Sequence, residues 1–222
     1  MCGRFAFIAS YETLKVHYAL ANSVDITPRF NIAPGADVLC LVKTSSDELQ
    51  AVVLHWGLIP SWAKDKKKIG SLINARAETL FEKPAFRGAM KTRRCLMPLS
   101  GFFEWHRENG MKQPYFFHKT NEEVLSVAAL WGTWQSRDEV IHSCCLITVD
   151  ANPLMEPIHH RMPAILNEKA QALWLDNSQC PKEELMALLK PYPYDDLETY
   201  RVTPLMNKAD FDNPLALKAL IK

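Results

Sequence analysis

Short apolar runs recur along the middle of the chain, and their length and composition predict strands. They are rich in Val, Leu, Phe and Trp and cover residues 38–42, 51–58, 94–106, 113–118, 124–134 and 142–149. Glu108-Asn109-Gly110 separates two of these runs, and Asn-Gly favours the positive φ angles of a tight hairpin turn. We therefore expect mostly antiparallel β-structure in this region.

Helical patterns are fewer and surround or interrupt the strand region. The predicted helices cover residues 13–20 after a Ser10 cap, 75–80, 85–91, 168–175 after an Asn167 cap, 182–189 after Pro181, and 213–221. Residues 27–35 are expected to be extended chain and a turn. This order predicts an α+β fold: a single domain over residues 1–222, with a curved, mostly antiparallel sheet or partly open barrel flanked by helices.

The composition is that of a soluble globular protein. Of the 222 residues, 48% are hydrophobic and 23% are charged. The apolar stretch Phe5–Ala9 is too short for the core of a signal peptide, and no later run approaches the roughly 18 apolar residues of a membrane span. We expect a cytoplasmic protein with reduced thiols and no membrane association.

Basic residues are concentrated in one part of the chain. The net charge is only +1, but residues 64–94 contain ten Lys or Arg and only three acidic residues. This asymmetry is consistent with a cationic patch that neutralises the phosphates of a polyanion, or with a solvated lysine-rich loop. Charge alone does not choose between them.

Among six cysteines, Cys2 has the unusual position. No pair has C-x-x-C spacing, so we predict no structural zinc site, and Cys144 and Cys145 lie in an apolar run typical of a buried strand. Removal of Met1 would give Cys2 a free amine beside its thiol. This pair traps aldehydes, because the amine forms a Schiff base and the thiol then closes a thiazolidine ring. Residue 2 belongs to no evident core pattern.

Three other polar residues lie in segments that are otherwise largely apolar, and each has two interpretations. Glu104, between Phe103 and Trp105, is either a catalytic carboxylate or a surface residue on a half-exposed strand. His159 is either an acid or base or a hydrogen-bonded structural residue. Asn74 belongs either to a site or to the cap of the helix expected from residue 75.

Together these segments resemble the SOS-response-associated peptidase (SRAP) family of abasic-site processing and DNA–protein crosslinking proteins. The resemblance rests on motifs at Met1–Phe5, Phe30–Gly35, Trp56–Trp62, Asn74–Thr79, Arg93–Trp105, Lys112–Tyr115, Ala128–Trp131 and Ile158–Pro163. Their order and spacing extend over about residues 1–166. His160 departs from the family pattern, which often has Asp there, and so does Leu99-Ser100, where Ala-Asp is common.

The resemblance implies an abasic-site sensor that binds single-stranded DNA and crosslinks it through Cys2. By motif position, Asn74 would orient the adduct, Glu104 would act as acid or base, and His159 would assist opening of the sugar ring. The DNA-binding residues would be Arg4, Trp62, Lys66, Lys67, Arg76, Arg87 and Arg93. Abasic-site lyase activity and a self-processing peptidase step are also implied.

No cofactor and no metal is expected, and we expect a monomer that associates with the nucleoid when it acts on DNA. Two other classes remain open. An N-terminal nucleophile glutamine amidotransferase also begins Met-Cys-Gly, although no ammonia-site motif is evident. A non-covalent DNA-binding module would explain the basic segment but would leave Cys2, Glu104 and His159 without a role.

Overall fold

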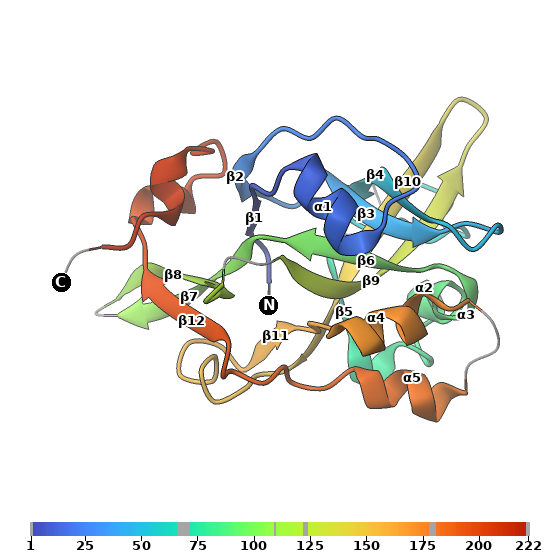
Figure 1. The fold of residues 1–222 in the computed structure, drawn as a ribbon. Coiled ribbons are helices and arrows are strands. Elements are labelled where there is room, and N and C mark those ends of the chain that lie inside the picture. The colour runs from blue at the N-terminus through green and yellow to red at the C-terminus, as the bar shows by residue number, and fades with distance from the viewer. Residues whose placement is uncertain (1, 66–71, 109, 122–123, 178–180, 221–222) are drawn as a thin grey trace.

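Two β-sheets and a few short helices form the fold (Figure 1). The computed structural model describes residues 2–65, 72–108, 110–121, 124–177 and 181–220. The strands are β1 Phe5–Phe7, β2 Arg29–Ile32, β3 Asp37–Lys43, β4 Leu49–Trp56, β5 Asn74–Arg76, β6 Arg94–Leu99, β7 Gly101–Glu108, β8 Met111–Lys119, β9 Leu125–Gln135, β10 Val140–Asp150, β11 Arg161–Pro163 and β12 Leu197–Arg201. The helices are α1 Tyr11–Tyr18, α2 Pro84–Arg87, α3 Ala89–Thr92, α4 Glu168–Leu175 and α5 Lys182–Leu188, with 3-10 turns η1 Ala77–Thr79, η2 Pro204–Asn207 and η3 Pro214–Leu217.

The larger sheet closes on itself. Strand pairing runs from β10 through β4, β3, β6 and β9 and returns to β10, with β5 and β11 also paired to β10. β10 is parallel to β4 and β5, whereas the other pairs are antiparallel. A small closed barrel is filled by side chains, and this one holds buried apolar residues and thiols. The α+β fold with a mostly antiparallel barrel is confirmed, and the barrel is closed rather than partly open.

The smaller sheet is fully antiparallel, in the order β12-β8-β7-β1-β2. β1 lies between β2 and β7, so the start of the chain is held inside the structure rather than at its edge (Figure 1). The predicted hairpin joins β7 to β8, with Glu108 opposite Met111 and a positive φ of 79° at Gly110. Asn109 lies outside the described residues.

One predicted strand, over residues 94–106, is two strands in different sheets. β6 ends at Leu99 in the larger sheet, and β7 begins at Gly101 in the smaller sheet. A Cβ atom at Gly101 would lie 2.3 Å from Cζ of Phe116 and 2.6 Å from the Phe117 carbonyl oxygen. Glycine therefore permits the close approach of β7 and β8 at the point where the chain changes sheets.

The helix predictions are confirmed for α1, α4 and α5, and for residues 85–91, which form α2 and α3. Ser10 and Asn167 accept the expected capping hydrogen bonds from the backbone N–H groups of Thr13 and Ala170. The prediction of a helix over residues 75–80 is wrong. This stretch is β5 followed by the single turn η1, because parallel pairing with β10 satisfies its backbone. The C-terminal stretch is also a 3-10 turn, η3, in place of the predicted helix.

Candidate functional site

The cysteine at position 2 is fully buried, in contrast to the expectation from its lack of a core pattern. It has 0% exposure and belongs to the main apolar cluster. The Phe103 N–H donates to the Arg4 carbonyl at 2.9 Å, which continues the pairing of β1 with β7 toward the chain start. The Cys2 thiol lies 3.9 Å from that same carbonyl oxygen. Sheet pairing, not apolar periodicity, therefore places this residue.

Asn74 reaches Cys2 directly. Its side-chain Nδ2 donates to the Cys2 carbonyl oxygen at 2.9 Å. Asn74 begins β5 and lies opposite Leu146 of β10, so it is a strand residue and not the helix cap that was the alternative interpretation. The Trp56 indole N–H and the Leu146 N–H both donate to the Ile73 carbonyl, at 3.0 and 3.1 Å, and fix the residue before it. The side-chain amide of Asn74 is thereby positioned to contact a residue 72 positions earlier in the sequence.

Glu104 is a buried carboxylate, with 3% exposure in the middle of β7. The interpretation as a surface residue on a half-exposed strand is wrong. Strand alternation separates its neighbours as expected: Phe102 packs in the main core, whereas Phe103 and Trp105 pack with the smaller C-terminal cluster. The negative charge of Glu104 acts on both the Cys2 thiol and the His159 imidazole. These three side chains therefore lie within electrostatic reach of one another.

His159 comes from the loop between β10 and β11. Its backbone N–H donates to the Met155 carbonyl at 2.9 Å, and its ring Nδ1 lies 3.0 Å from the Arg161 N–H, which donates to it. The ring stacks on that of His160, with centroids 4.4 Å apart. Buried Asn152 fixes the start of the loop, because its side chain accepts from the Met155 N–H and donates to the Tyr192 carbonyl, both at 2.9 Å.

Arg161 joins this loop to the segment that follows Asn74, and no role was assigned to it from the sequence. Its side chain is 7% exposed and contacts both oxygens of Glu78, at 2.8 and 3.1 Å. It also donates to Asp150 Oδ1 and to the Thr148 carbonyl, both at 2.6 Å. The forked guanidinium suits such multiple contacts. The sequence signal was its place within the Ile158–Pro163 motif.

Burial is the main cause of the pKa shifts of both Cys2 and His159. Burial raises the pKa of the Cys2 thiol far above its ordinary value, and the Glu104 charge raises it further. Burial lowers the pKa of His159, which Glu104 opposes by favouring the imidazolium. At neutral pH the thiol is thus protonated and the imidazole is neutral.

The predicted DNA-binding residues occupy two different places. Arg4 and Arg76 lie beside the cluster: Arg4 is in the segment of Cys2, and exposed Arg76 is two residues after Asn74. Arg4 already donates to Asn31 Oδ1 at 2.9 Å and to the Met206 carbonyl at 3.1 Å, with its guanidinium 6.0 Å from the Trp105 ring centroid.

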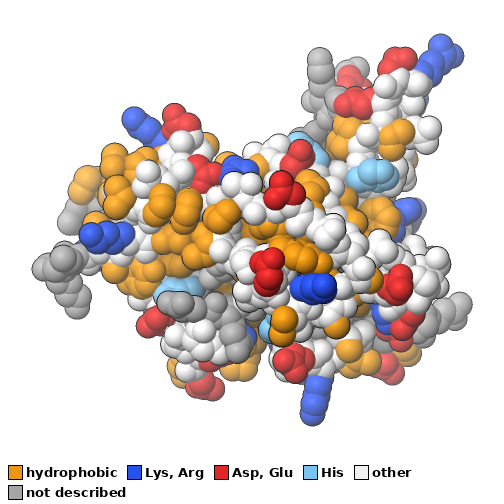
Figure 2. Space-filling model, turned by 45° about the horizontal axis from the view of Figure 1, so that its top comes forward, with side chains coloured by type: hydrophobic (Ala, Val, Ile, Leu, Met, Phe, Trp, Pro, Cys, Tyr) orange, Lys and Arg blue, Asp and Glu red, His pale blue; other side chains and the backbone are white. Residues whose placement is uncertain are grey.

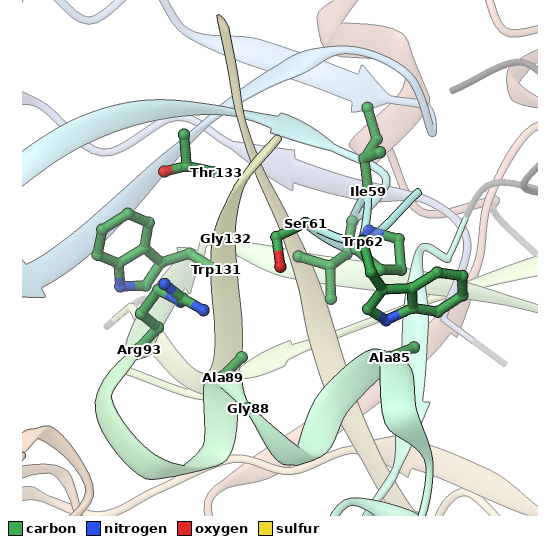
Figure 3. Close-up of a pocket in the computed structure, with 12 residues that line it drawn as sticks. Ile59, Ser61, Trp62, Ala85, Gly88, Ala89, Arg93, Trp131, Gly132 and Thr133 are labelled. Carbon is green, nitrogen blue, oxygen red and sulfur yellow. The ribbon is translucent and has the colours of Figure 1, made fainter. Parts of the chain in front are cut away.

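The other place is a hollow lined by Trp62 and Arg93 (Figure 3), and exposed Arg87 immediately precedes its Gly88. Lys66 and Lys67 lie outside the described residues. Among the described residues that line this hollow, none is Cys2, Asn74, Glu104 or His159. The sequence-predicted set is therefore divided between two locations.

Part of the basic segment is structural. Arg94 is 1% exposed and donates to the carbonyls of Trp174, Met90 and Lys91, at 2.7, 2.7 and 3.2 Å. It ties β6 to α4 and contributes no surface charge. On the face shown in Figure 2, acidic and basic side chains are interspersed around apolar ones. That face is not a cationic patch.

Within the described ranges, no group of three or more His, Cys, Asp or Glu side chains is arranged to hold a metal ion. No described helix has the length and apolar character needed to cross a membrane. Fold and site together define an α+β protein in which a cysteine at position 2 meets an amide, a buried carboxylate and a neutral imidazole.

The chain belongs to the SOS response associated peptidase (SRAP) family, whose model matches residues 1–209. It is 35% identical over 219 residues to the abasic site processing protein YoqW of Bacillus subtilis, covering 96% of this chain and 97% of that protein. It is 32% identical to the abasic site processing protein HMCES of Gallus gallus, over 79% of this chain and 60% of that protein. A crystal structure of a Bacteroides thetaiotaomicron protein superposes with a TM-score of 0.86 at 30% identity, covering 99% and 100% of the two chains.

Proposed function

We propose that this protein processes abasic sites in single-stranded DNA by forming a covalent thiazolidine crosslink through Cys2. The observation that supports it most is the convergence of Asn74, Glu104 and His159 on a cysteine at position 2. Relatives that align over nearly their whole length carry the name abasic site processing protein. The partner would be DNA with an exposed aldehyde at a lost base.

The reaction begins with the amine. With Met1 in place the Cys2 nitrogen is an amide, so removal of Met1 must come first, either by an aminopeptidase or by self-processing. The freed α-amine, with a reference pKa of about 7.7–8.0, is partly neutral at pH 7, whereas the raised pKa keeps the buried thiol protonated. The amine therefore attacks C1′ of the ring-opened sugar before the thiol does.

Proton transfers then follow from the positions of the side chains. His159 assists opening of the sugar ring, in which the C1′ hydroxyl loses its proton to become the carbonyl and the ring oxygen gains one. The amine adds to C1′, and one of its protons passes to the carbonyl oxygen, which becomes a hydroxyl. Glu104 then moves the second amine proton to that hydroxyl, so that water leaves and a C1′–N double bond forms. The sulfur next bonds to C1′, the π electrons pass to nitrogen, and the thiol proton ends on that nitrogen. The net change is loss of one water, and Asn74 holds the Cys2 carbonyl throughout.

The same intermediate permits a lyase side reaction. A protonated imine at C1′ acidifies C2′, and loss of a C2′ proton expels the 3′ phosphate by β-elimination. Closure of the thiazolidine ring removes the imine and suppresses this cleavage. The balance between crosslink and strand break therefore depends on how fast the thiol closes the ring.

Incubation with a single-stranded oligonucleotide containing one abasic site, followed by denaturing electrophoresis, tests the proposal. We expect a heat-stable shifted band from the wild type and none from Cys2→Ala. Cys2→Ser should form a band only when borohydride reduces the imine, because a hydroxyl closes no thiazolidine. Mass spectrometry of the wild-type product should show loss of Met1 and one water. A durable crosslink from Cys2→Ala would contradict the thiazolidine, and binding without any crosslink would favour a non-covalent module.

A further inference from the structure

The loop between β10 and β11 brings two imidazole rings into contact (Figure 1). The ring centroids of His159 and His160 lie 4.4 Å apart and the ring planes are inclined by 23°, so the two rings are stacked. His159 is half-buried, whereas His160 is exposed. The proposed reaction uses His159 and gives His160 no role. A titratable ring stacked on a reacting ring acts on its charge as well as on its orientation.

Backbone contacts hold both histidines in place. The His159 N–H donates to the Met155 carbonyl at 2.9 Å, and the Ala151 N–H donates to the His160 carbonyl at 3.1 Å. The next residue is fixed by its side chain, because the Arg161 guanidinium donates to the Thr148 carbonyl at 2.6 Å. The stacking of the two rings is therefore built into a loop whose backbone is anchored on both sides.

The Arg161 backbone serves the His159 ring in both of its neutral forms. Nδ1 of His159 lies 3.0 Å from the Arg161 nitrogen, whose N–H donates to it, and 3.2 Å from the Arg161 carbonyl oxygen. When Nδ1 carries the proton, it donates to that carbonyl, and Nε2 is left as the basic nitrogen. In the proposed reaction, opening of the sugar ring needs a base of this kind, because the C1′ hydroxyl must lose its proton.

Only a neutral His159 can take this proton. Nε2 accepts it from the C1′ hydroxyl as the carbonyl forms, the bond from C1′ to the ring oxygen breaks, and its electron pair goes to the ring oxygen. The imidazolium then returns the proton to that oxygen, so the ring ends neutral again. An imidazolium present at the start has no lone pair for the first step.

Charges act on the His159 ring from three parts of the chain. Glu104 on β7 favours the imidazolium, whereas the amino terminus and a protonated His160 oppose it. The Arg161 backbone also favours the imidazolium through its contact with Nδ1. Because His160 is exposed, water solvates a charge on its ring better than a charge on half-buried His159. Charging both rings would place two positive charges at the 4.4 Å separation of the stack.

We propose that His160 is a positioning residue that keeps His159 in its neutral, proton-accepting form as the solution becomes acidic. It holds the His159 ring in the stack, and it takes up an added proton on the exposed ring, which then repels a second proton from His159. This inference rests on the proposed function, because the neutral form is the one that opens the sugar ring. His160 itself takes no part in bond formation.

NMR titration of the histidine rings in the DNA-free protein measures this effect without any crosslinking. Loss of a signal in His159→Gln assigns the His159 ring. A unit charge about 4 Å away changes proton affinity about 5-fold even in water, which equals about 0.7 pH unit. His160→Asp should therefore raise the pH at which His159 is half-protonated by about 0.7–1.4 pH units, and His160→Gln by at most about 0.7.

His17→Asp supplies the matched control, because it makes the same exchange at an exposed position on α1. It should leave the His159 titration unchanged. An unchanged His159 midpoint in His160→Asp, or an equal rise in His17→Asp, would overturn the proposal. Circular dichroism of each variant confirms folding.

Crosslinking kinetics test whether the charge of His159 matters for ring opening. Two single-stranded substrates are compared: a true abasic site, and an acyclic aldehyde analogue that cannot close into a sugar ring. Both undergo the same amine step, so the ratio of their rates reports ring opening. At pH 6 this ratio should be about 5- to 25-fold lower in His160→Asp than in the wild type, and the two should agree at pH 8. An equal loss at both pH values would indicate a structural defect and overturn the proposal.

The two measurements separate this inference from the proposed function. A shifted His159 titration in His160→Asp, with no crosslink to either substrate in the wild type, would support the action of His160 on His159 and contradict the Cys2 reaction. Crosslinks to both substrates with an unchanged His159 titration in His160→Asp would support the Cys2 reaction and contradict the role of His160.

Discussion

Arg161→Met is expected to loosen the His159 loop from the segment that carries Asn74. The guanidinium is the one described side chain that contacts Glu78, Asp150 and the Thr148 carbonyl together. The His159 ring in turn accepts from the Arg161 backbone N–H. Loss of the guanidinium removes these side-chain contacts of Arg161, while methionine still fills much of the volume of its apolar stem.

The expected cost is about 2–3 kcal/mol of unfolding free energy. Breaking a fully buried ion pair costs about 3–5 kcal/mol, but here the carboxylate side chains of Glu78 and Asp150 are 51% and 78% exposed and water can solvate them. The buried Thr148 carbonyl loses a charged donor, which costs about 1–3 kcal/mol. For a chain of this size, such a loss lowers Tm by about 4–12 °C.

Urea unfolding monitored by fluorescence, with the wild type and Glu78→Gln in parallel, measures this cost. Glu78→Gln leaves the contacts of Arg161 to Asp150 and Thr148 in place, so we expect a loss of about 0–1 kcal/mol. The crosslinking rate of Arg161→Met should also fall, whereas that of Glu78→Gln should change little. If Arg161→Met unfolded at the same urea concentration as the wild type, the side-chain contacts of Arg161 would contribute nothing measurable to stability.

Three further outcomes are expected. Asn74→Ala should slow crosslinking about 2- to 10-fold, as loss of one hydrogen bond to the Cys2 carbonyl implies, and gel time courses measure it. The folded pKa of His159 lies below its unfolded value, so the unfolded chain binds more protons and stability should fall as pH drops below about 6.5; urea titrations should show that His159→Gln weakens this dependence. Cys2→Ala should cost about 1 kcal/mol of stability, because this buried residue leaves a small void, and thermal unfolding detects it.

Much of the fold follows from the sequence because its signals are local. Ser10 and Asn167 cap helices by contacts within three residues, and Gly110 supplies the positive φ of the hairpin. The helix prediction for residues 75–80 was wrong because the interactions that determine this segment are not local. Their backbone is satisfied by parallel pairing with β10, about 70 residues later in the chain, and no local pattern reports such a pairing. The break at Gly101 was missed because both strands around it are buried and apolar.

The candidate site residues were predicted from residue type and motif, whereas their burial did not follow from the sequence. Cys2 has no periodic neighbours, yet it is fully buried because β1 pairs on both sides and Asn74 reaches it from β5. The number of basic residues in 64–94 also overstated the surface charge of that segment. Arg94 is buried and connects β6 to α4 through its hydrogen bond to the Trp174 carbonyl. Arg93 lines the hollow, whereas its neighbour Arg94 is buried. The turn from α3 into β6 determines this difference.

Burial of the Cys2 thiol bears on the order of steps in the proposed reaction. An exposed thiolate would attack aldehydes and oxidants alike, whereas a protonated thiol beside Glu104 is a poor nucleophile until an electrophilic carbon is held next to it. In the proposed reaction, ring closure after the amine has bonded to C1′ would be intramolecular and would need no free thiolate in the resting state. The burial that makes Cys2 inert toward solvent would then also place its thiol for ring closure, and selectivity for an aldehyde would arise from the amine step.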